Sequence, residues 1–75
     1  MKSIQQETLE VLIRDQALRE CRAVRVEGGW CLEGRIGLGW RPVRSRREAV
    51  RVWRSLTAVE RFCVSVGLKT LTVEL

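Results

Sequence analysis

The N-terminal part of the chain carries apolar side chains at helical spacing. From Ile4 to about Cys21 they recur every three or four residues, and charged side chains fill the opposite side. Ser3 and Gln6 have the spacing of a capping box, which satisfies free backbone groups at a helix start. The pattern predicts an amphipathic helix whose mildly negative charge suits it to covering a sheet.

The period of the pattern changes to two between residues 23 and 36, which predicts two strands joined at Gly28-Gly29. A loop of these two glycines alone would put Trp30 on the face opposite the preceding valines. A three-residue loop over 27–29 places the apolar side chains of both strands on one face. We therefore predict a hairpin with this loop and with Trp30 pointing inward. The predicted pairs are Val26 with Trp30 and Val24 with Leu32.

A third strand is predicted near Trp40 to Ser45, where Pro42 indicates an edge or a position without a ladder hydrogen bond. The last strand is predicted from Leu68 to Leu75, because apolar and polar residues alternate there. Gly67 precedes it and supplies the left-handed residue that ends a helix at Val66.

Residues 46–56 fit two structures. In the first, Ser45 and Glu48 form a capping box, and a long helix places Trp53 on its apolar stripe. In the second, Val50–Trp53 is a strand, and a shorter helix follows with Thr57 as its cap. The strand would point Trp53 outward beside Arg51, where it could act as an interface anchor or a stacking platform.

These elements predict one small α+β domain over residues 1–75. It consists of an N-terminal amphipathic helix, an antiparallel β-meander, a second helix and a C-terminal strand. A chain of 75 residues buries only about 60 to 65% of its unfolded surface, so its core is small. We therefore expect a homodimer, in which contacts between copies add stability.

Positive charge is concentrated in residues 35–54, where seven arginines face the single acid Glu48 and leave a local charge of +6. The whole chain has a net charge of +5, so this segment accounts for all of the excess. Guanidinium groups bind phosphates and carboxylates in a forked geometry and stack on flat rings. The segment is therefore the candidate binding site for DNA or an acidic partner. The candidate residues are Arg35, Arg41, Arg44, Arg46, Arg47, Arg51, Arg54 and Trp53.

The composition argues against catalysis and against a bound cofactor. The chain has no histidine, its acids are scattered, and no glycine pattern forms a phosphate-binding loop. Its three cysteines form no CxxC pair, so we expect buried structural thiols and neither a disulfide framework nor a metal site. No apolar run is long enough for a membrane span or a secretory signal, which predicts a cytoplasmic protein that does not bind a membrane. Because no catalytic constellation is present, we also expect no small-molecule substrate.

Several short motifs carry a resemblance to a known family. They are Gly28-Gly-Trp30, Arg35-Ile-Gly37, Arg41-Pro-Val43, Val50-Arg-Val-Trp-Arg54 and Val66-Gly-Leu68. With these motifs the last two thirds of the chain resembles the ParC-family partition-associated proteins, short proteins encoded beside partition genes on bacterial plasmids.

The resemblance bears on both structure and function. It favours the strand at Val50–Trp53 followed by a helix at Ala58–Val66, although the extra charged residues at 44–48 keep the long helix open. It implies an accessory role in plasmid maintenance and offers no catalytic residues. We expect a non-enzymatic accessory that binds DNA or a partition protein through its arginines. The alternative is a homodimeric protein-interaction module without a role in nucleic-acid binding.

Overall fold

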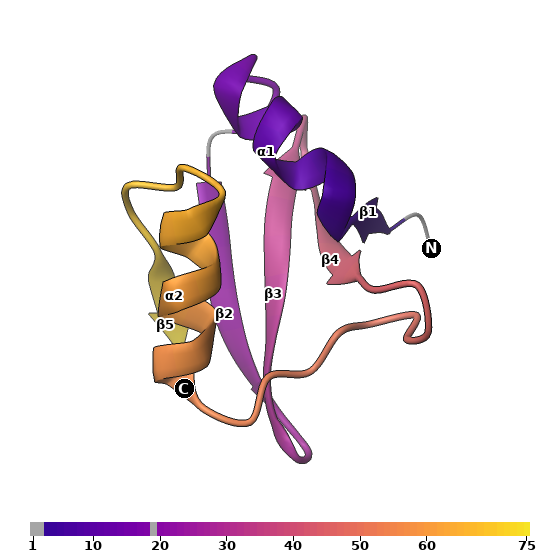
Figure 1. Ribbon diagram of the computed structural model, residues 1–75, viewed down its shortest axis with the longest axis vertical. Coiled ribbons are helices and arrows are strands. Elements are labelled where there is room, and N and C mark those ends of the chain that lie inside the picture. Colours follow the sequence, from indigo (N-terminus) through magenta and orange to yellow (C-terminus); the bar gives the residue numbers. More distant parts are fainter. Residues whose placement is uncertain (1–2, 19) are drawn as a thin grey trace.

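The chain folds into two layers, a mixed five-stranded sheet and two helices that lie on the same side of it (Figure 1). The computed structural model describes residues 3–18 and 20–75, so Met1, Lys2 and Arg19 of the predicted domain lie outside the described residues. The strand order in the sheet is β1-β4-β3-β2-β5. The predicted α+β class is confirmed. In chain order the elements are β1 (Ile4–Gln5), α1 (Gln6–Arg14), β2 (Glu20–Val26), β3 (Gly29–Ile36), β4 (Gly39–Arg44), α2 (Leu56–Ser65) and β5 (Thr72–Glu74).

The N-terminal helix is confirmed but is shorter than the predicted range of 4–21. Its first predicted residues form β1 instead, which pairs in parallel with the end of β4. The N-cap is Gln5 and has no side-chain hydrogen bond, so the predicted capping box of Ser3 and Gln6 is wrong. At the other end, Gln16 has a φ of 61°, and this left-handed residue stops the helix.

The hairpin of β2 and β3 has a shorter loop than predicted. Val26 pairs with Gly29, so Glu27 and Gly28 alone form the turn, and the three-residue loop is wrong. The register pairs Ala23 with Leu32 and Arg25 with Trp30. Trp30 points inward, as predicted, and is buried. The valines Val24 and Val26 therefore lie on the other face of the sheet, which no helix covers.

The register of this hairpin depends on a close approach of Gly29 to residues 53 and 54. A Cβ atom on Gly29 would lie 2.0 Å from the carbonyl oxygen of Trp53, so only glycine fits there. Next to it, Trp30 and Trp53 form an antiparallel bridge in which each backbone N–H donates to the other carbonyl at 2.8 Å. Gly29 is therefore the first residue of a strand rather than part of the loop.

Residues 45–55 contain neither of the predicted structures in full. The long helix is wrong, and of the predicted strand Val50–Trp53 only Trp53 forms a bridge. α2 begins at Leu56, two residues earlier than the predicted shorter helix. Its N-cap is Ser55, whose hydroxyl accepts from the Ala58 N–H at 3.2 Å, so the predicted cap at Thr57 is wrong.

The C-terminal part begins where α2 ends. Gly67 has a φ of 90°, as expected for a left-handed stop, and the N–H of Leu68 donates to the carbonyl of Cys63 at 2.9 Å. The final strand is confirmed, but β5 covers only Thr72–Glu74 of the predicted range of 68–75. It pairs in parallel with β2 rather than extending an antiparallel meander, because the chain crosses over the sheet through α2.

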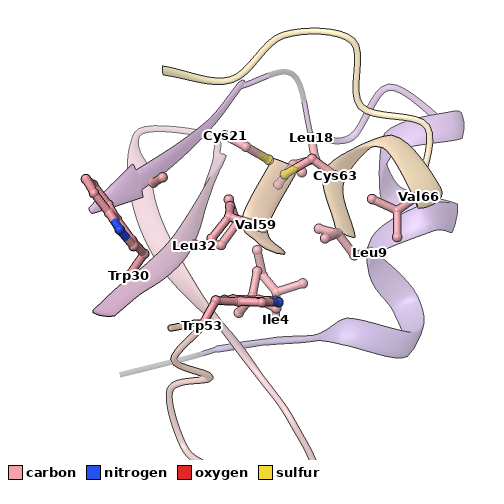
Figure 2. Close-up of a cluster of buried hydrophobic side chains, with 12 residues drawn as sticks. Ile4, Leu9, Leu18, Cys21, Trp30, Leu32, Trp53, Val59, Cys63 and Val66 are labelled. Atoms are coloured by element: carbon pink, nitrogen blue, oxygen red, sulfur yellow. The ribbon is translucent and has the colours of Figure 1, made fainter. Parts of the chain in front are cut away.

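One apolar cluster joins both helices to the sheet (Figure 2). Leu9 of α1, Val59 of α2 and Leu32 of β3 are fully buried members of this cluster. The cluster also contains Val43 of β4 and the ring of Trp53, which lies in the segment before α2. This cluster therefore lies between the sheet and the helices. Cys31, which pairs with Val24, is buried on the other face of the sheet.

Replacement of Gly29 by alanine should destabilise the fold by about 2 to 3 kcal/mol, because the new Cβ collides with a backbone carbonyl and weakens the Trp30–Trp53 bridge. Urea unfolding measures the change. Gly39→Ala is the matched control, since a Cβ at Gly39 meets nothing within 4 Å. Equal midpoints for the two variants would contradict the role given to Gly29.

Candidate nucleic-acid interface

The strand arginines of segment 35–54 do not share one surface. Alternate residues of a strand face opposite sides of the sheet. Arg41 lies on the same face as the buried Val43, under the helices, whereas Arg35 and Arg44 lie on the open face. The expectation that all seven arginines act together is therefore corrected.

A basic loop, which we define as residues 44–50, begins at the last residue of β4 and carries Arg44, Arg46 and Arg47. It leaves the sheet and returns to it at once, because the N–H of Arg51 donates to the carbonyl of Val43 at 2.9 Å. Within the loop, the hydroxyl of Ser45 accepts from the Glu48 N–H at 3.0 Å. The N–H of Ser45 also donates to the Glu48 carbonyl at 3.2 Å.

The Ser45 and Glu48 pattern therefore forms a turn rather than the start of a helix. The serine hydroxyl makes the contact expected of a cap. In a helix the Glu48 carbonyl would accept from an N–H further along the chain. Here it accepts from the N–H of Ser45, three residues earlier. This local turn holds the basic loop out from the domain (Figure 1).

The guanidinium groups of the basic loop are weakly neutralised. Nε of Arg46 lies 3.7 Å from a carboxylate oxygen of Glu7, and the two side chains are 86% and 48% exposed. An ion pair in such exposed surroundings contributes about 0 to 1 kcal/mol, so a phosphate can displace it. Nε of Arg44 donates to the carbonyl of Ser45 at 3.2 Å. Among residues 3–18 and 20–75, Arg44 and Arg47 form no ion pair with an acid.

Arg51 has a structural position. Its guanidinium lies 4.4 Å from the centre of the Trp53 ring and 5.4 Å from that of Phe62, and it donates a hydrogen bond to the side chain of Gln6. These contacts join the segment before α2 to the start of α1 and to α2. A cation in this half-buried stack is worth about 1 to 2 kcal/mol, and it is not presented to a large partner.

Trp53 is a core residue. It is 6% exposed, and its ring packs against Phe62 with 5.1 Å between the centroids. Its backbone bridge to Trp30 puts both side chains on the helix side of the sheet. The proposed use of Trp53 as an exposed anchor or stacking platform is therefore corrected.

The remaining candidate arginines lie away from the basic loop. Arg54 is exposed beside the turn of the β2–β3 hairpin, where its Cα lies next to Gly29. Arg35 sits on the open sheet face at 3.4 Å from Glu20, and its guanidinium lies 6.0 Å from the Trp40 ring. The fold thus brings together Arg44, Arg46 and Arg47.

Sequence reasoning missed a network around Arg22 on the open face of the sheet. Its Nε lies 2.7 Å from Glu33, its Nη1 lies 3.4 Å from Glu74, and its guanidinium lies 4.0 Å over the Trp40 ring. Arg22 and Glu33 are direct neighbours in the hairpin register. Opposite charges at paired positions were the available signal, but the predicted register concealed them.

The three cysteines are free and buried, as expected. Burial raises the pKa of Cys21 to about 12, and the nearby Cys63 adds to this rise. Burial also raises the pKa of Cys63 to about 11. The pKa of Cys31 is raised by burial first and by Glu33 second. Neutral buried thiols of this kind are poor nucleophiles near neutral pH.

The rest of the described structure adds no other type of site. Within residues 3–18 and 20–75, no group of three or more cysteine and acidic side chains is arranged to hold a metal ion. In the same residues, no helix has the length and apolar character needed to cross a membrane.

Comparisons with known proteins identified no relative. No family model, no curated protein sequence and no solved structure matches this chain.

Replacement of Arg51 by lysine should lower the free energy of unfolding by about 1 kcal/mol, because lysine keeps the charge but loses the planar stack on Trp53 and Phe62. Urea unfolding provides the measurement. Arg61→Lys on the exposed side of α2 is the control and should leave stability within about 0.5 kcal/mol of the parent. Equal stability of the two variants would show that the stack contributes nothing.

The buried thiols should make stability fall at alkaline pH. Their pKa is raised in the folded protein above the ordinary 9.0, so the unfolded chain loses these protons first. The stabilisation is complete below about pH 9 and is lost as the pH rises toward about 11. The chain has no histidine and no tyrosine, so few other groups titrate between about pH 8 and 10.

Urea midpoints measured across this pH window test the thiol prediction. The Cys63→Ala variant should be less stable at neutral pH, because it loses packing, and should also show a shallower alkaline decline. A parent midpoint that stays constant up to pH 10 would contradict the prediction.

Proposed function

We propose that this protein is a non-enzymatic binding module whose basic loop contacts the phosphates of duplex DNA. The observation that carries the proposal is the exposure of Arg46 and Arg47, next to Arg44, since within residues 3–18 and 20–75 these three arginines make only one weak ion pair, that of Arg46 with Glu7. Three guanidinium groups on a short loop match the negative charge of a phosphate backbone, which dominates non-specific DNA binding.

The local composition favours phosphates over the acidic surface of a protein. The part of the basic loop that carries the arginines, residues 44–48, is Arg, Ser, Arg, Arg and Glu, and the apolar Ala49 and Val50 follow it. Protein interfaces usually have an apolar centre rimmed by polar groups. A contact made of guanidinium groups alone fits DNA better, although a partition protein with an acidic surface is the competing partner.

The biological setting that we propose is plasmid maintenance. This part of the proposal rests on the short motifs that resemble the ParC-family partition-associated proteins. Arg41-Pro-Val43 in β4 leads directly into the basic loop, and Val50-Arg-Val-Trp-Arg54 returns from it. An accessory that binds DNA beside a partition system would need charge and a rigid support, and no catalytic group.

The structure lowers the expected number of phosphate contacts. Arg51 is held in the half-buried stack and Arg35 is paired with Glu20 away from the basic loop, so about three arginines remain for one DNA surface. The slope of log affinity against log salt should then be about −2.7, which corresponds to a loss of roughly 40-fold between 50 and 200 mM salt.

The double variant Arg46→Gln/Arg47→Gln should reduce this slope to about −0.9, because only Arg44 would still meet a phosphate. Fluorescence anisotropy with a labelled duplex over a salt series measures the slope. The matched control is Arg14→Gln/Arg61→Gln, which removes the same charge from exposed positions on the two helices. Since salt screens distant charges, the control slope should stay near that of the parent.

Two results would contradict the DNA proposal. One is an equal loss of slope in the double variant and in its control, which would reduce the effect to net charge. The other is the absence of duplex binding together with salt-dependent binding to a polyglutamate peptide. That second result would favour an acidic protein as the partner of the basic loop.

A further inference from the structure

β5 lies at the edge of the sheet and pairs with β2 on its inner side only. Within residues 3–18 and 20–75 no strand pairs with its outer side. The free N–H and C=O groups of such an edge can pair with an extended strand from another chain. We propose that the outer edge of β5 pairs antiparallel with the same edge of a second copy, so that one sheet runs through a homodimer.

The apolar side chains around β5 favour a second copy as the occupant. Leu71, Val73 and Leu75 alternate along the chain, and Val73 pairs with the buried Ala23 on the helix side of the sheet. Leu75 is 96% exposed and Val73 is 39% exposed. Antiparallel pairing centred on Val73 puts Val73 opposite its own copy and Leu71 opposite Leu75. Each exposed leucine thereby meets the half-buried leucine of the other chain.

The charges on the opposite face agree with this register. Thr72 and Glu74 point to the open face, and the register puts each Glu74 opposite Thr72 of the second copy, so no like charges meet. Thr72 is also the neighbour of Arg22 in the β2–β5 ladder. Arg22 of one copy and Glu74 of the other then flank the same threonine. Arg22 already lies 3.4 Å from Glu74 of its own chain. In the dimer, Arg22 and Glu74 of the two copies would therefore follow one another across the open face, with opposite charges next to each other.

Other registers fit less well. A shift that centres the pairing on Glu74 would set two carboxylates directly opposite one another, which is destabilising in a strand pair. A shift in the other direction, to Thr72, would put Leu75 opposite Lys69 instead of an apolar side chain. Charge and apolar pattern therefore select the register centred on Val73.

The proposed dimer leaves the basic loop free. Its two-fold axis runs perpendicular to the sheet, as in any antiparallel strand pair, so the helices of both copies lie on one face. The basic loop follows β4, which is separated from β5 by β3 and β2. Self-association is therefore independent of DNA binding and can be tested without nucleic acid.

Sedimentation equilibrium without DNA tests the dimer. A three-residue edge buries less area than the roughly 1,200 Å² of a stable interface, so the association should be weak and should become visible by about 1 mM. Val73→Lys places two ammonium groups opposite one another and should raise the dissociation constant at least tenfold. Val11→Lys is the matched control, because Val11 is 43% exposed on α1, and it should associate like the parent.

Two sedimentation results would overturn the proposal. One is a parent protein that stays monomeric over the whole concentration range. The other is equal association of Val73→Lys and Val11→Lys.

A cysteine variant tests the register and stays informative if Val73→Lys fails to fold. Val73→Cys puts two thiols at directly opposed positions about 5.5 Å apart or less between Cα atoms, a spacing that allows a disulfide. Diamide should convert this variant to a covalent dimer at least tenfold faster than the control Thr70→Cys. Diamide takes up the two electrons and two protons that the thiols lose. The native cysteines are buried and should not react. Equal crosslinking rates for the two variants would refute the register.

Discussion

The arrangement of the second half of the chain depends on the backbone bridge between Trp30 and Trp53. Residues 45–55 have no helix and no extended strand, so no repeating hydrogen-bond pattern fixes their path. The two reciprocal hydrogen bonds of the bridge attach the segment to β3 at one point. Gly29 makes the approach possible because it has no side chain, and Arg51 covers the Trp53 ring from outside. The segment is thereby attached to the sheet although it has no regular secondary structure.

This attachment divides the arginines into two classes. Where the segment contacts the core, the guanidinium of Arg51 stacks on the rings of Trp53 and Phe62 and donates to Gln6. Where the segment is turned away from the core, at Arg46 and Arg47, the charge remains in solvent. The same residue type thus stabilises the fold at one end of the segment and is available to a partner at the other. Local charge density in the sequence cannot separate these roles, because only the path of the backbone assigns them.

The sequence predicted the elements better than their contacts. Apolar periodicity located both helices and strands β2 to β5, because burial of one face imposes a period on any regular element, but it assigned the residues of β1 to the first helix. The predicted hairpin loop was one residue too long because it included Gly29. Gly29 belongs to the strand, where it lies against the carbonyl of Trp53, 24 positions further along the chain. Trp53 was misplaced for the same reason, because a single bridge leaves no periodic pattern to read. Within the candidate site, Arg46 and Arg47 are exposed, whereas Arg51 contacts the neighbouring Trp53 and two residues distant in sequence, Phe62 and Gln6.

The open face of the sheet is a weaker candidate for binding than the basic loop or the outer edge of β5. Both helices lie on the other face, and a sheet with one bare apolar face would aggregate. Here the guanidinium of Arg22 lies over the Trp40 ring and pairs with Glu33 and Glu74, so it covers this ring while the two acids offset its charge. The basic loop keeps its charge, and β5 keeps its unpaired backbone groups and exposed leucine. Because these two features lie at different edges of one sheet, a dimer joined through β5 would present two basic loops far apart, and would favour long DNA over isolated phosphates.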